Sequence, residues 1–255
     1  LKLPLNWKFP LMGKARRGGY DGKGTFVINN FDNLQSLLTS VDTNQWMIET
    51  WVSYEKELAL VASRDLLGRV RTLPLVETYQ HQQVCDWVIA PANIDNEVEI
   101  MAYNIACSVL NELNYFGVIG IEFFYGKEGL LVNEIAPRTH NSAHFSIEAC
   151  SSSQFDQQIC IASNLPVPET ELIVPGAIMV NLLGLEKGST APINERLEKL
   201  RSCKDVYLHW YEKEIEVPGR KLGHATVLLN SCDPFARNVE AVDAMKRIRD
   251  IWPIV

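Results

Sequence analysis

The sequence predicts an α+β fold of antiparallel sheets with flanking helices. Apolar segments joined by short polar turns indicate β-hairpins, above all over residues 117–136, and amphipathic stretches between them indicate helices. Hairpin-connected strands favour this class over a doubly wound parallel sheet. A length of 255 residues allows one large domain or two modest ones.

Composition narrows the classes of partner. Lys and Arg number 24 against 31 Asp and Glu, and the net charge of −7 argues against a dedicated nucleic-acid binder, which needs clustered positive charge. No apolar run approaches the roughly 20 residues that span a bilayer, so no membrane partner is expected. The six cysteines occur singly, without a CxxC pair, which disfavours zinc and indicates a reducing compartment.

The first quarter of the chain alternates strands with one helix. Residues 9–16 and 25–30 predict a hairpin whose turn is the glycine-rich segment 18–24. The elements expected after this hairpin are a short helix at 32–40 and strands at 47–52 and 57–63.

The middle of the chain carries the clearest helix and the clearest hairpin. A helix is predicted over 94–113 with Asp95 as its N-cap. Its expected apolar face is formed by Val98, Met101, Ile105, Val109 and Leu113. The strong hairpin 117–136 follows, and then a polar loop at 136–144.

The last hundred residues again mix both kinds of element. We expect a helix within 152–163 and a proline-marked connection at 165–175. The remaining predicted elements are strands at 176–184, 206–213 and 224–230 and helices at 193–202 and 235–252. The final helix is expected to bury one side that carries Phe235, Val239, Val242, Met245 and Ile248.

The glycine-rich turn 18–24 is a candidate phosphate site. It holds four glycines in seven residues, and backbone N–H groups in such a turn can surround phosphate oxygens because no Cβ blocks close approach. Lys14, Arg16, Arg17 and Lys23 add positive charge around it. The segment matches neither GxxxxGK[ST] nor a GxGxxG in a βαβ unit. A plain surface turn is the alternative interpretation.

Two carboxylates in the hairpin 117–136 form a candidate metal site. If residues 127–129 make a three-residue loop with Gly129 left-handed, Glu122 lies directly opposite Glu134. The two Cβ atoms are then about 5 Å apart, and two like charges there favour a hard divalent cation between them. Apolar neighbours suggest that the pair is half-buried. A different register, with one glutamate facing solvent, is the alternative.

The polar loop after this hairpin is a candidate anion site. Within seven residues it offers a guanidinium, two imidazoles, an amide and a hydroxyl, a set that suits a small anion and a sugar phosphate. These side chains belong to Arg138, His140, Asn141, Ser142 and His144. A Ser–His–Asp hydrolase is disfavoured because the chain has no GxSxG motif.

A third basic cluster lies near the end of the chain. Lys213, Arg220 and Lys221 could hold a phosphate. On the residues alone, a solvated hairpin turn explains them better.

Several motifs, in order, closely resemble the 5-(carboxyamino)imidazole ribonucleotide synthases, a family within the ATP-grasp superfamily. The matching blocks are KARRGGYDGKG, GIEFF…LLVNEIAPRTHNSAH, IEACSSSQFDQQ and GRKLGH, and the resemblance runs from about Leu3 to about Asp250. It implies an ATP-grasp fold with a small β-rich C-terminal domain. It also implies phosphorylation of bicarbonate by ATP to carboxyphosphate, followed by carboxylation of 5-aminoimidazole ribonucleotide in purine biosynthesis.

The resemblance implies roles for particular residues. The elements that cover the ATP phosphates would be Lys14, Gly19, Tyr20, Asp21, Gly22, Lys23, Gly24 and Thr25. The adenine hinge would be Glu49, Thr50, Trp51 and Val52, with Glu57 on the ribose and Asn133 and Glu134 also at the nucleotide. Mg²⁺, or Mn²⁺, would be bound by Glu122 and Glu134. The substrate site would include Tyr20, Asp21, Arg138, Ser142, His144, Lys213, Arg220 and Lys221, with catalysis by Lys14, Arg138, His140 and Asn141.

Two departures from the family pattern stand out. The family has a nucleotide-contacting histidine where this chain has Gln80, with His81 one place later, so either residue is a candidate for that contact. The family also carries an N-terminal α/β domain ahead of this region, and we expect that domain to be missing here, which would limit turnover.

The expected organisation is an ATP-grasp domain at 1–184 and a C-terminal domain at 185–255. Within the first, residues 1–60 would bear the lid and 61–184 the metal and substrate sites. A cytoplasmic ligase, a homodimer and a mutase partner or fusion are expected. The alternatives are another ATP-grasp carboxylate–amine ligase, or a non-catalytic nucleotide-binding fragment.

Overall fold

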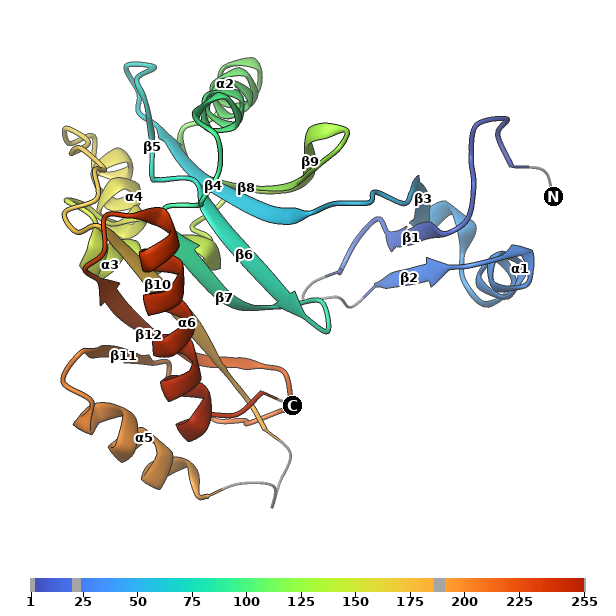
Figure 1. The fold of residues 1–255 in the computed structure, drawn as a ribbon. Helices are drawn as coiled ribbons and strands as arrows, with labels where there is room; N and C mark the ends of the chain where they lie inside the picture. Colours follow the sequence, from blue (N-terminus) through green and yellow to red (C-terminus); the bar gives the residue numbers. More distant parts are fainter. Residues whose placement is uncertain (1–2, 20–23, 186–190, 255) are drawn as a thin grey trace. The chain divides into compact units, whose positions relative to one another are not determined.

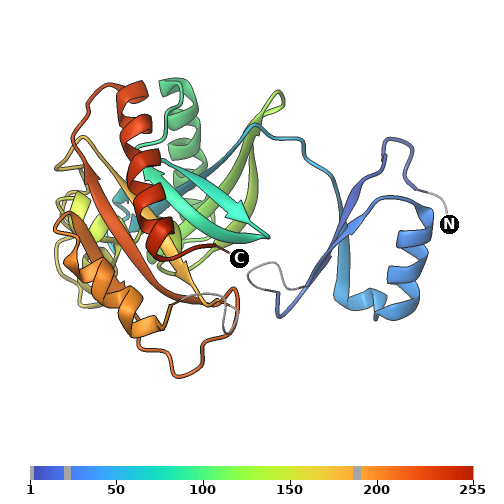
Figure 2. The same cartoon turned by 60° about the horizontal axis from the view of Figure 1, so that its bottom comes forward.

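The computed structural model describes residues 3–19, 24–185 and 191–254, and the chain forms two compact units (Figures 1 and 2). The first unit comprises Leu1–Tyr54 with His81–Val84, and the second comprises Glu55–Gln80 with Cys85–Val255. The expected boundaries at 60/61 and 184/185 both fall inside the second unit, and as domain boundaries they stay predictions.

The first unit is a three-stranded antiparallel sheet with a helix packed on it. The strand order is β2-β1-β3, and the elements are β1 (Leu11–Ala15), β2 (Thr25–Ile28), α1 (Phe31–Ser40), the 3₁₀ turn η1 (Thr43–Gln45) and β3 (Trp46–Thr50). Asn30 caps α1, because its side chain accepts a hydrogen bond from the backbone N–H of Asn33. The small core consists of Leu11, Ile28, Leu34 and Leu37. The predicted hairpin, helix and third strand are confirmed.

A nine-stranded sheet organises the second unit. Its strand order is β11-β12-β10-β7-β6-β4-β8-β9, with β5 paired to β4. The strands are β4 (Lys56–Arg64), β5 (Val70–Thr72), β6 (Val76–His81), β7 (Val84–Ala90), β8 (Gly117–Gly126), β9 (Gly129–Ala136), β10 (Gly176–Leu183), β11 (Val206–Trp210) and β12 (Lys221–Leu229). The pairings of β4 with β8, β8 with β9, β10 with β7, and β12 with β10 and β11 are antiparallel. The C-terminal strands therefore extend the same sheet.

Helices cover both faces of this sheet. They are α2 (Asn96–Glu112), α3 (Ser146–Ala149), α4 (Gln154–Ala162), α5 (Ile193–Ser202) and α6 (Pro234–Ile251), with a 3₁₀ turn η2 (Asn141–Ala143). On one face of β4 and β8, alternate apolar residues pack under α2 (Figure 1). On the other face, Ala59, Val61 and Val118 pack with Phe145 and Ala149, next to the predicted polar loop. The sheet thus places that loop on the face opposite α2.

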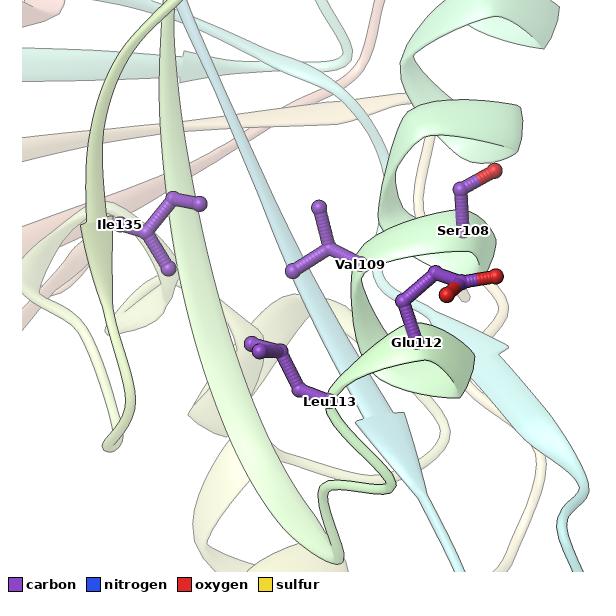
Figure 3. A pocket seen from close by; sticks show the side chains of 5 residues that line it. All are labelled: Ser108, Val109, Glu112, Leu113 and Ile135. Carbon is purple, nitrogen blue, oxygen red and sulfur yellow. The ribbon is translucent and has the colours of Figure 1, made fainter.

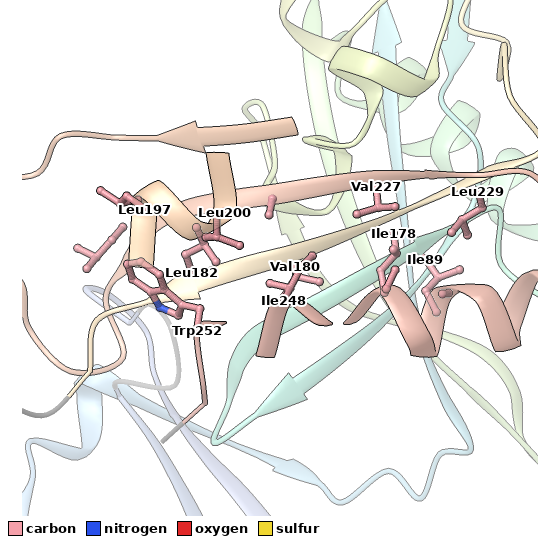
Figure 4. Close-up of a cluster of buried hydrophobic side chains, with 14 of the residues drawn as sticks. Ile89, Ile178, Val180, Leu182, Leu197, Leu200, Val227, Leu229, Ile248 and Trp252 are labelled. Carbon is pink, nitrogen blue, oxygen red and sulfur yellow. The ribbon is translucent and has the colours of Figure 1, made fainter. Parts of the chain in front are cut away.

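The C-terminal strands and helices share a core of their own. Strand β10 is buried along its whole length, and Ile178, Val180 and Leu182 lie against the residues of α5 and α6 (Figure 4). Trp252 closes this core, is fully buried, and donates from its indole N–H to the backbone oxygen of Leu183.

The predicted buried faces of the two long helices are partly wrong. In α2 the buried residues are Val98, Ala102, Ala106 and Leu110, while Leu113 is 64% exposed. In α6 they are Arg237, Ala241, Ala244 and Ile248, while Phe235 is 77% exposed. In both helices alanines fit the close approach to the sheet, and larger apolar residues lie at the edge of the face or in solvent. Side-chain volume outweighs hydrophobicity at these contacts.

One consequence is a shallow apolar pocket beside β9. It is lined by Ser108, Val109, Glu112, Leu113 and Ile135, where the last turns of α2 leave their larger side chains beside the strand (Figure 3).

In the described part of the chain, no helix is both long and apolar enough to cross a membrane.

Candidate functional site

The first unit holds Lys14 and Glu49 on neighbouring strands. Lys14 lies on β1 opposite Thr25 and Met47, and its Nζ is 2.7 Å from Oε2 of Glu49 on β3. Both side chains are partly exposed, so this ion pair adds little to stability. The lysine is therefore held at the base of the glycine-rich turn by a partner that a phosphate could replace at small cost.

The described ends of the glycine-rich turn need glycine. Gly24 has φ +84°, and a Cβ there would lie 3.1 Å from the Cβ of Ala15 and 3.3 Å from the Cα of Gly19. The next residue, Thr25, donates through its hydroxyl to Oε1 of Gln83 at 2.5 Å. Gln83 belongs to the turn between β6 and β7, and its contact with the hairpin was not predicted. Tyr20, Asp21, Gly22 and Lys23 lie outside the described residues.

The nucleotide contacts implied for the hinge stay predictions. Thr50 ends β3, and Trp51 and Val52 follow it outside regular structure, with Trp51 exposed. Glu57 lies on β4, opposite Thr78 on β6 and Phe124 on β8. Gln80 and His81 are the last two residues of β6, so their side chains are expected on opposite sides of that strand.

The predicted register of the acidic hairpin is confirmed, although its basis is partly wrong. Glu122 on β8 lies directly opposite Glu134 on β9. Near the turn, however, Gly126 pairs with Gly129, whereas the assumed three-residue loop would pair it with Leu130. The register there is therefore shifted by one residue. A bulge at Asn133 restores the predicted pairing. Gly129 has φ +85°, as expected for the left-handed position. Glu122 is half-buried, and Glu134 is exposed.

His140 packs directly onto the strand next to Glu122. Gly120 on β8 leaves the space, because a Cβ there would lie 2.6 Å from the Cβ and 2.7 Å from the Cγ of His140. Nε2 of His140 is 3.3 Å from Oε1 of Glu122, and its Nδ1 is 2.8 Å from the hydroxyl of Ser142. The backbone N–H of Ser142 also points at Nδ1, at 3.4 Å. Nδ1 is thus the acceptor, which leaves the proton on Nε2, facing the carboxylate.

Glu122 is kept ionised by its surroundings. Burial alone would raise the pKa of Glu122. The hydrogen bond from His140, with the charges of Lys221 and Arg138, outweighs burial and brings the pKa of Glu122 below its ordinary value. The fold therefore gathers four of the predicted site residues: Glu122, Arg138, His140 and Lys221.

Gln154 holds the polar loop after the acidic hairpin through hydrogen bonds to His140. This residue was not predicted from the sequence. Its Oε1 accepts from the backbone N–H of His140 at 2.7 Å, and its Nε2 donates to the backbone oxygen of His140 at 2.8 Å. The same Nε2 lies 3.0 Å from Nδ1 of His144. Gln154 is fully buried at the first position of α4, after a capping box of Ser153 and Asp156. That capping box was the available signal.

His144 is the first of three stacked imidazoles. Its ring stacks on His224 of β12 with centroids 4.9 Å apart, and His224 stacks on His209 of β11 at 4.5 Å. Phe155 stacks on the other side of His144 at 5.6 Å. Burial, with the charges of His140, Lys221 and His209, lowers the pKa of His144 to about 4. His144 is therefore neutral at physiological pH, with its proton on Nε2 because Gln154 donates to Nδ1.

The other two imidazoles of the stack, His209 at its end and His224 at its centre, also have polar partners. His209 Nε2 lies 2.6 Å from Oε1 of Glu148, a carboxylate that is nearly buried. Tyr211 places its hydroxyl 2.7 Å from Nδ1 of His224. Burial, with the charges of His144 and His209, lowers the pKa of His224 to about 2. Sequence reasoning did not find His209, His224 or Glu148, which the fold brings together from distant segments.

Asn141 and the basic residues complete the described site. The side-chain amide of Asn141 pairs with that of Asn181 on β10. Lys213 donates to the backbone oxygen of Lys221 at 2.6 Å. Arg220 is exposed and donates to the backbone oxygen of Ile215. Lys221 is thus close enough to Glu122 to help lower its pKa, while phosphate binding by Lys213, Arg220 and Lys221 stays a prediction.

The donor set at Glu122 and Glu134 fits a hard divalent cation. Two carboxylates side by side on neighbouring strands supply oxygen ligands, which Mg²⁺ and Mn²⁺ prefer. Among residues 3–19, 24–185 and 191–254, no cluster of three or more His, Cys, Asp and Glu side chains could hold a metal on its own.

Two family models match the chain. An ATP-grasp domain matches residues 3–155, and a phosphoribosylaminoimidazole carboxylase C-terminal domain matches residues 177–237. The first match contains the acidic hairpin and the loop after it, and the second contains Asn181, His209 and His224.

Similar proteins are longer than this chain. An N5-carboxyaminoimidazole ribonucleotide synthase of Synechococcus elongatus is 42% identical over 96% of this chain and 62% of its own length. One of Bacillus subtilis is 35% identical over 91% of this chain and 60% of its own length. The phosphoribosylaminoimidazole carboxylase of Saccharomyces cerevisiae is 35% identical over 88% of this chain and 40% of its own length. The chain thus spans about 60% of the bacterial relatives.

Solved structures agree with the fold. The Aspergillus clavatus N5-carboxyaminoimidazole synthase in complex with ADP and 5-aminoimidazole ribonucleotide superposes with a TM-score of 0.81. Its sequence is 30% identical, and the match covers 95% of this chain and 62% of that one. The Staphylococcus aureus synthetase complexed with ADP gives a TM-score of 0.82 at 33% identity, with the same coverage. The predicted α+β class and ATP-grasp architecture are confirmed.

Proposed function

The chain belongs to the ATP-grasp family, and from that premise we propose that it carboxylates 5-aminoimidazole ribonucleotide with ATP and bicarbonate. One observation carries the proposal most directly. Glu122 lies opposite Glu134, and its carboxylate is paired with the imidazole of His140, which belongs to the polar loop that follows the hairpin. The similarity to N5-carboxyaminoimidazole ribonucleotide synthases, and to the Aspergillus clavatus enzyme in complex with 5-aminoimidazole ribonucleotide, supports the choice of substrate.

The proposed reaction has two group transfers. An oxygen of bicarbonate attacks the γ-phosphorus of ATP, which forms carboxyphosphate and releases ADP. The exocyclic amine of the ribonucleotide then attacks the carboxyl carbon, phosphate leaves, and the amine loses a proton. The product is the N-carboxy derivative.

Glu122 and Glu134 would hold the metal of the ATP complex, Mg²⁺ or Mn²⁺. Such an ion, when bound, neutralises phosphate oxygens on which negative charge develops. The contribution of His140 is orientation, since its Nε2–H holds the Glu122 carboxylate in place on the face of β8. The ionised state of Glu122 at neutral pH suits it to this ligand role.

The loop after the hairpin would receive the two anions. Arg138 offers a guanidinium fork for bicarbonate or carboxyphosphate. Asn141 and Ser142 offer neutral hydrogen bonds beside it. His144 is neutral and carries its proton on Nε2, so it donates without adding charge. Lys213, Arg220 and Lys221 are proposed for the ribonucleotide phosphate, and Lys221 already lies near Glu122.

The first unit would contribute the nucleotide contacts. Lys14 exchanges Glu49 for phosphate oxygens in this scheme, at little energetic cost because the ion pair is partly exposed. The described glycines Gly19 and Gly24 and the hydroxyl of Thr25 border the turn that would cover the phosphates. Tyr20, Asp21, Gly22 and Lys23 are proposed from the family resemblance. The hinge Glu49–Val52 and His81 of the first unit, with Glu57, Asn133 and, as the alternative to His81, Gln80 of the second unit, are proposed for adenine and ribose.

The decisive assay is phosphate release from Mg-ATP in bicarbonate buffer, with and without 5-aminoimidazole ribonucleotide. The assay is run on this chain and on a chimera. The chimera adds to this chain the part of the Synechococcus elongatus relative that lies outside the matched region. Release that depends on the ribonucleotide is the expected result. Release without that dependence would favour another ATP-grasp ligase, and ADP binding without release would favour a non-catalytic module.

Partners follow from the same proposal. We propose a cytoplasmic homodimer that works with a mutase, as a separate subunit or a fused domain. The 40% coverage of the yeast carboxylase leaves room in that relative for further domains. A similar solved protein is the ATPase subunit of the phosphoribosylaminoimidazole carboxylase from Aquifex aeolicus, which supports a separate partner. Sedimentation of the full-length protein with and without the mutase tests both statements.

A further inference from the structure

The amide of Asn141 is paired edge to edge with the amide of Asn181. Nδ2 of Asn141 donates to Oδ1 of Asn181 at 2.9 Å, and Nδ2 of Asn181 donates to Oδ1 of Asn141 at 2.8 Å. Asn181 is fully buried near the end of β10, and every other residue of that strand except its first glycine is apolar. A buried amide in an apolar strand costs free energy unless its hydrogen bonds are satisfied.

The orientation of Asn181 is fixed from β7. Its Nδ2 also donates to the backbone oxygen of Cys85 at 2.9 Å. A carbonyl oxygen can only accept, so the nitrogen of Asn181 must face Cys85 and its oxygen must face Asn141. The orientation of the Asn141 amide follows in turn. The backbone of β7 therefore sets, through the buried side chain of Asn181, the direction in which Nδ2 of Asn141 faces.

The rest of Asn181 is also anchored. Its backbone oxygen accepts from Nη2 of Arg249 on α6 at 3.1 Å. On the neighbouring strand β12 it pairs with His224, the central imidazole of the stack. The Asn141–Asn181 pair uses one N–H of Asn141 and leaves the other N–H to donate. That remaining N–H belongs to the same loop as Arg138 and His140.

We propose that Asn181 is a positioning residue that presents this remaining N–H of Asn141 to the bicarbonate or carboxyphosphate anion. The proposal rests on the proposed function. Asn141 lies in the segment matched by the ATP-grasp model, and Asn181 lies in the segment matched by the C-terminal model. The C-terminal segment thus contributes to the anion site through a residue that touches no substrate.

The test is a double-mutant cycle on the form of the protein active in the phosphate-release assay. The variants are Asn181→Leu, Asn141→Ala and the double variant, and Thr226→Val on β12 is the matched control. Thr226 is fully buried, and its hydroxyl has no hydrogen-bond partner among the described residues, so its replacement removes a buried polar group without breaking a described hydrogen bond.

Asn181→Leu is expected to lower kcat/KM for bicarbonate about 10- to 100-fold, because a misplaced donor loses its alignment with the anion. The KM for ATP stays at the wild-type value. In the Asn141→Ala background the same change adds no further loss, since Asn181 acts through Asn141. Thr226→Val keeps wild-type kinetics. Additive losses, unchanged bicarbonate kinetics, or an equal fall in every parameter with a lower melting temperature would overturn the proposal.

A second measurement separates this inference from the proposed function. In ¹⁵N-labelled protein, one proton of the Asn141 side-chain amide is expected to exchange slowly with solvent, and Asn181→Leu or Asn181→Ala should speed that exchange at least tenfold. Equal exchange in wild type and variants would overturn the positioning role. Absence of ribonucleotide-dependent phosphate release, with protected exchange intact, would overturn the proposed function and the anion role, while leaving the amide pair established.

Discussion

Single residues set the chemistry of the acidic hairpin. Glu122 and Glu134 have the same side chain and lie opposite each other, yet only Glu122 is half-buried and bonded to His140. That contact exists because Gly120 has no side chain where the imidazole packs. Glu134, by contrast, is exposed and able to contact a solvated ligand.

Replacement of the exposed carboxylate is expected to separate catalysis from folding. Glu134→Ala should abolish ATP turnover, because one of the two proposed metal ligands is lost. The free energy of unfolding should change by less than about 0.5 kcal/mol, as for other exposed positions. Phosphate release and urea denaturation measure the two effects. Turnover retained in this variant would refute the metal assignment.

The buried imidazoles predict a pH dependence of stability. The pKa values of about 4 for His144 and about 2 for His224 lie below the ordinary value of 6.5, so the folded state stays neutral where the unfolded state takes up protons. Below about pH 6.5 the unfolded state binds more protons, and the free energy of unfolding falls as the pH falls. The expected loss between pH 7 and pH 5 is about 2 kcal/mol for each histidine.

Urea denaturation between pH 5 and pH 9 checks this dependence. His224→Phe should flatten the curve below pH 6.5, since one of the two groups is removed. Above pH 7.5 both histidines are neutral in both states, so wild type and variant should run parallel there. An identical slope in wild type and variant below pH 6.5 would contradict the role given to His224.

The helices and strands show which features of the fold could be predicted from sequence patterns. Most of the strands and helices, and the pairing of Glu122 with Glu134, could be predicted from alternation and turn residues, whereas strands β5, β6 and β7 and the short helix α3 were not predicted. The bulge at Asn133 could not, because a slip near the turn and a bulge along β9 cancel at the acidic pair. The contacts of Gln154, Asn181 and the stacked histidines depend on segments far apart in the chain, and periodicity contains no information about them.

The faces of the long helices could be predicted only in part, and this is testable. Ile248 is 1% exposed and Phe235 is 77% exposed, although both were assigned to the same face of α6. Ile248→Ala should lower the free energy of unfolding by about 2–5 kcal/mol, as expected for a buried large-to-small change. Phe235→Ala should cost less than about 0.5 kcal/mol. Equal losses of the free energy of unfolding in the two variants, measured by urea denaturation, would support the buried face predicted from the sequence.

Across the molecule, the second unit is held together from its C-terminal end. Arg249 on α6 pairs with the buried carboxylate of Asp86 on β7 and also donates to the backbone of Asn181 on β10. Burial lowers the pKa of Arg249 to about 10, which still leaves it charged at neutral pH. Strands from both family-matched segments are therefore tied to one helix.

Removal of Arg249 should destabilise the second unit strongly. Arg249→Leu leaves the carboxylate of Asp86 buried without its cation, and the expected loss is about 3–5 kcal/mol. The double variant Asp86→Leu and Arg249→Leu should recover most of it, because no buried charge remains. Urea denaturation of the two variants decides the matter. A double variant as unstable as the single one would mean that packing, and not charge, explains the loss.

The position of β10 beside β7 has a consequence for synthesis of the chain. β7 has β6 on one side, but until β10 forms the other side of its residues Trp87–Ala90 has no strand beside it, so β7 is an open and largely apolar sheet edge. The ribosome emits β10 roughly 85 residues after β7, which at about 5–20 residues per second leaves that edge open for several seconds. Nascent chains that stop before residue 176 should therefore self-associate or bind chaperones, and those extended past residue 229 should be released.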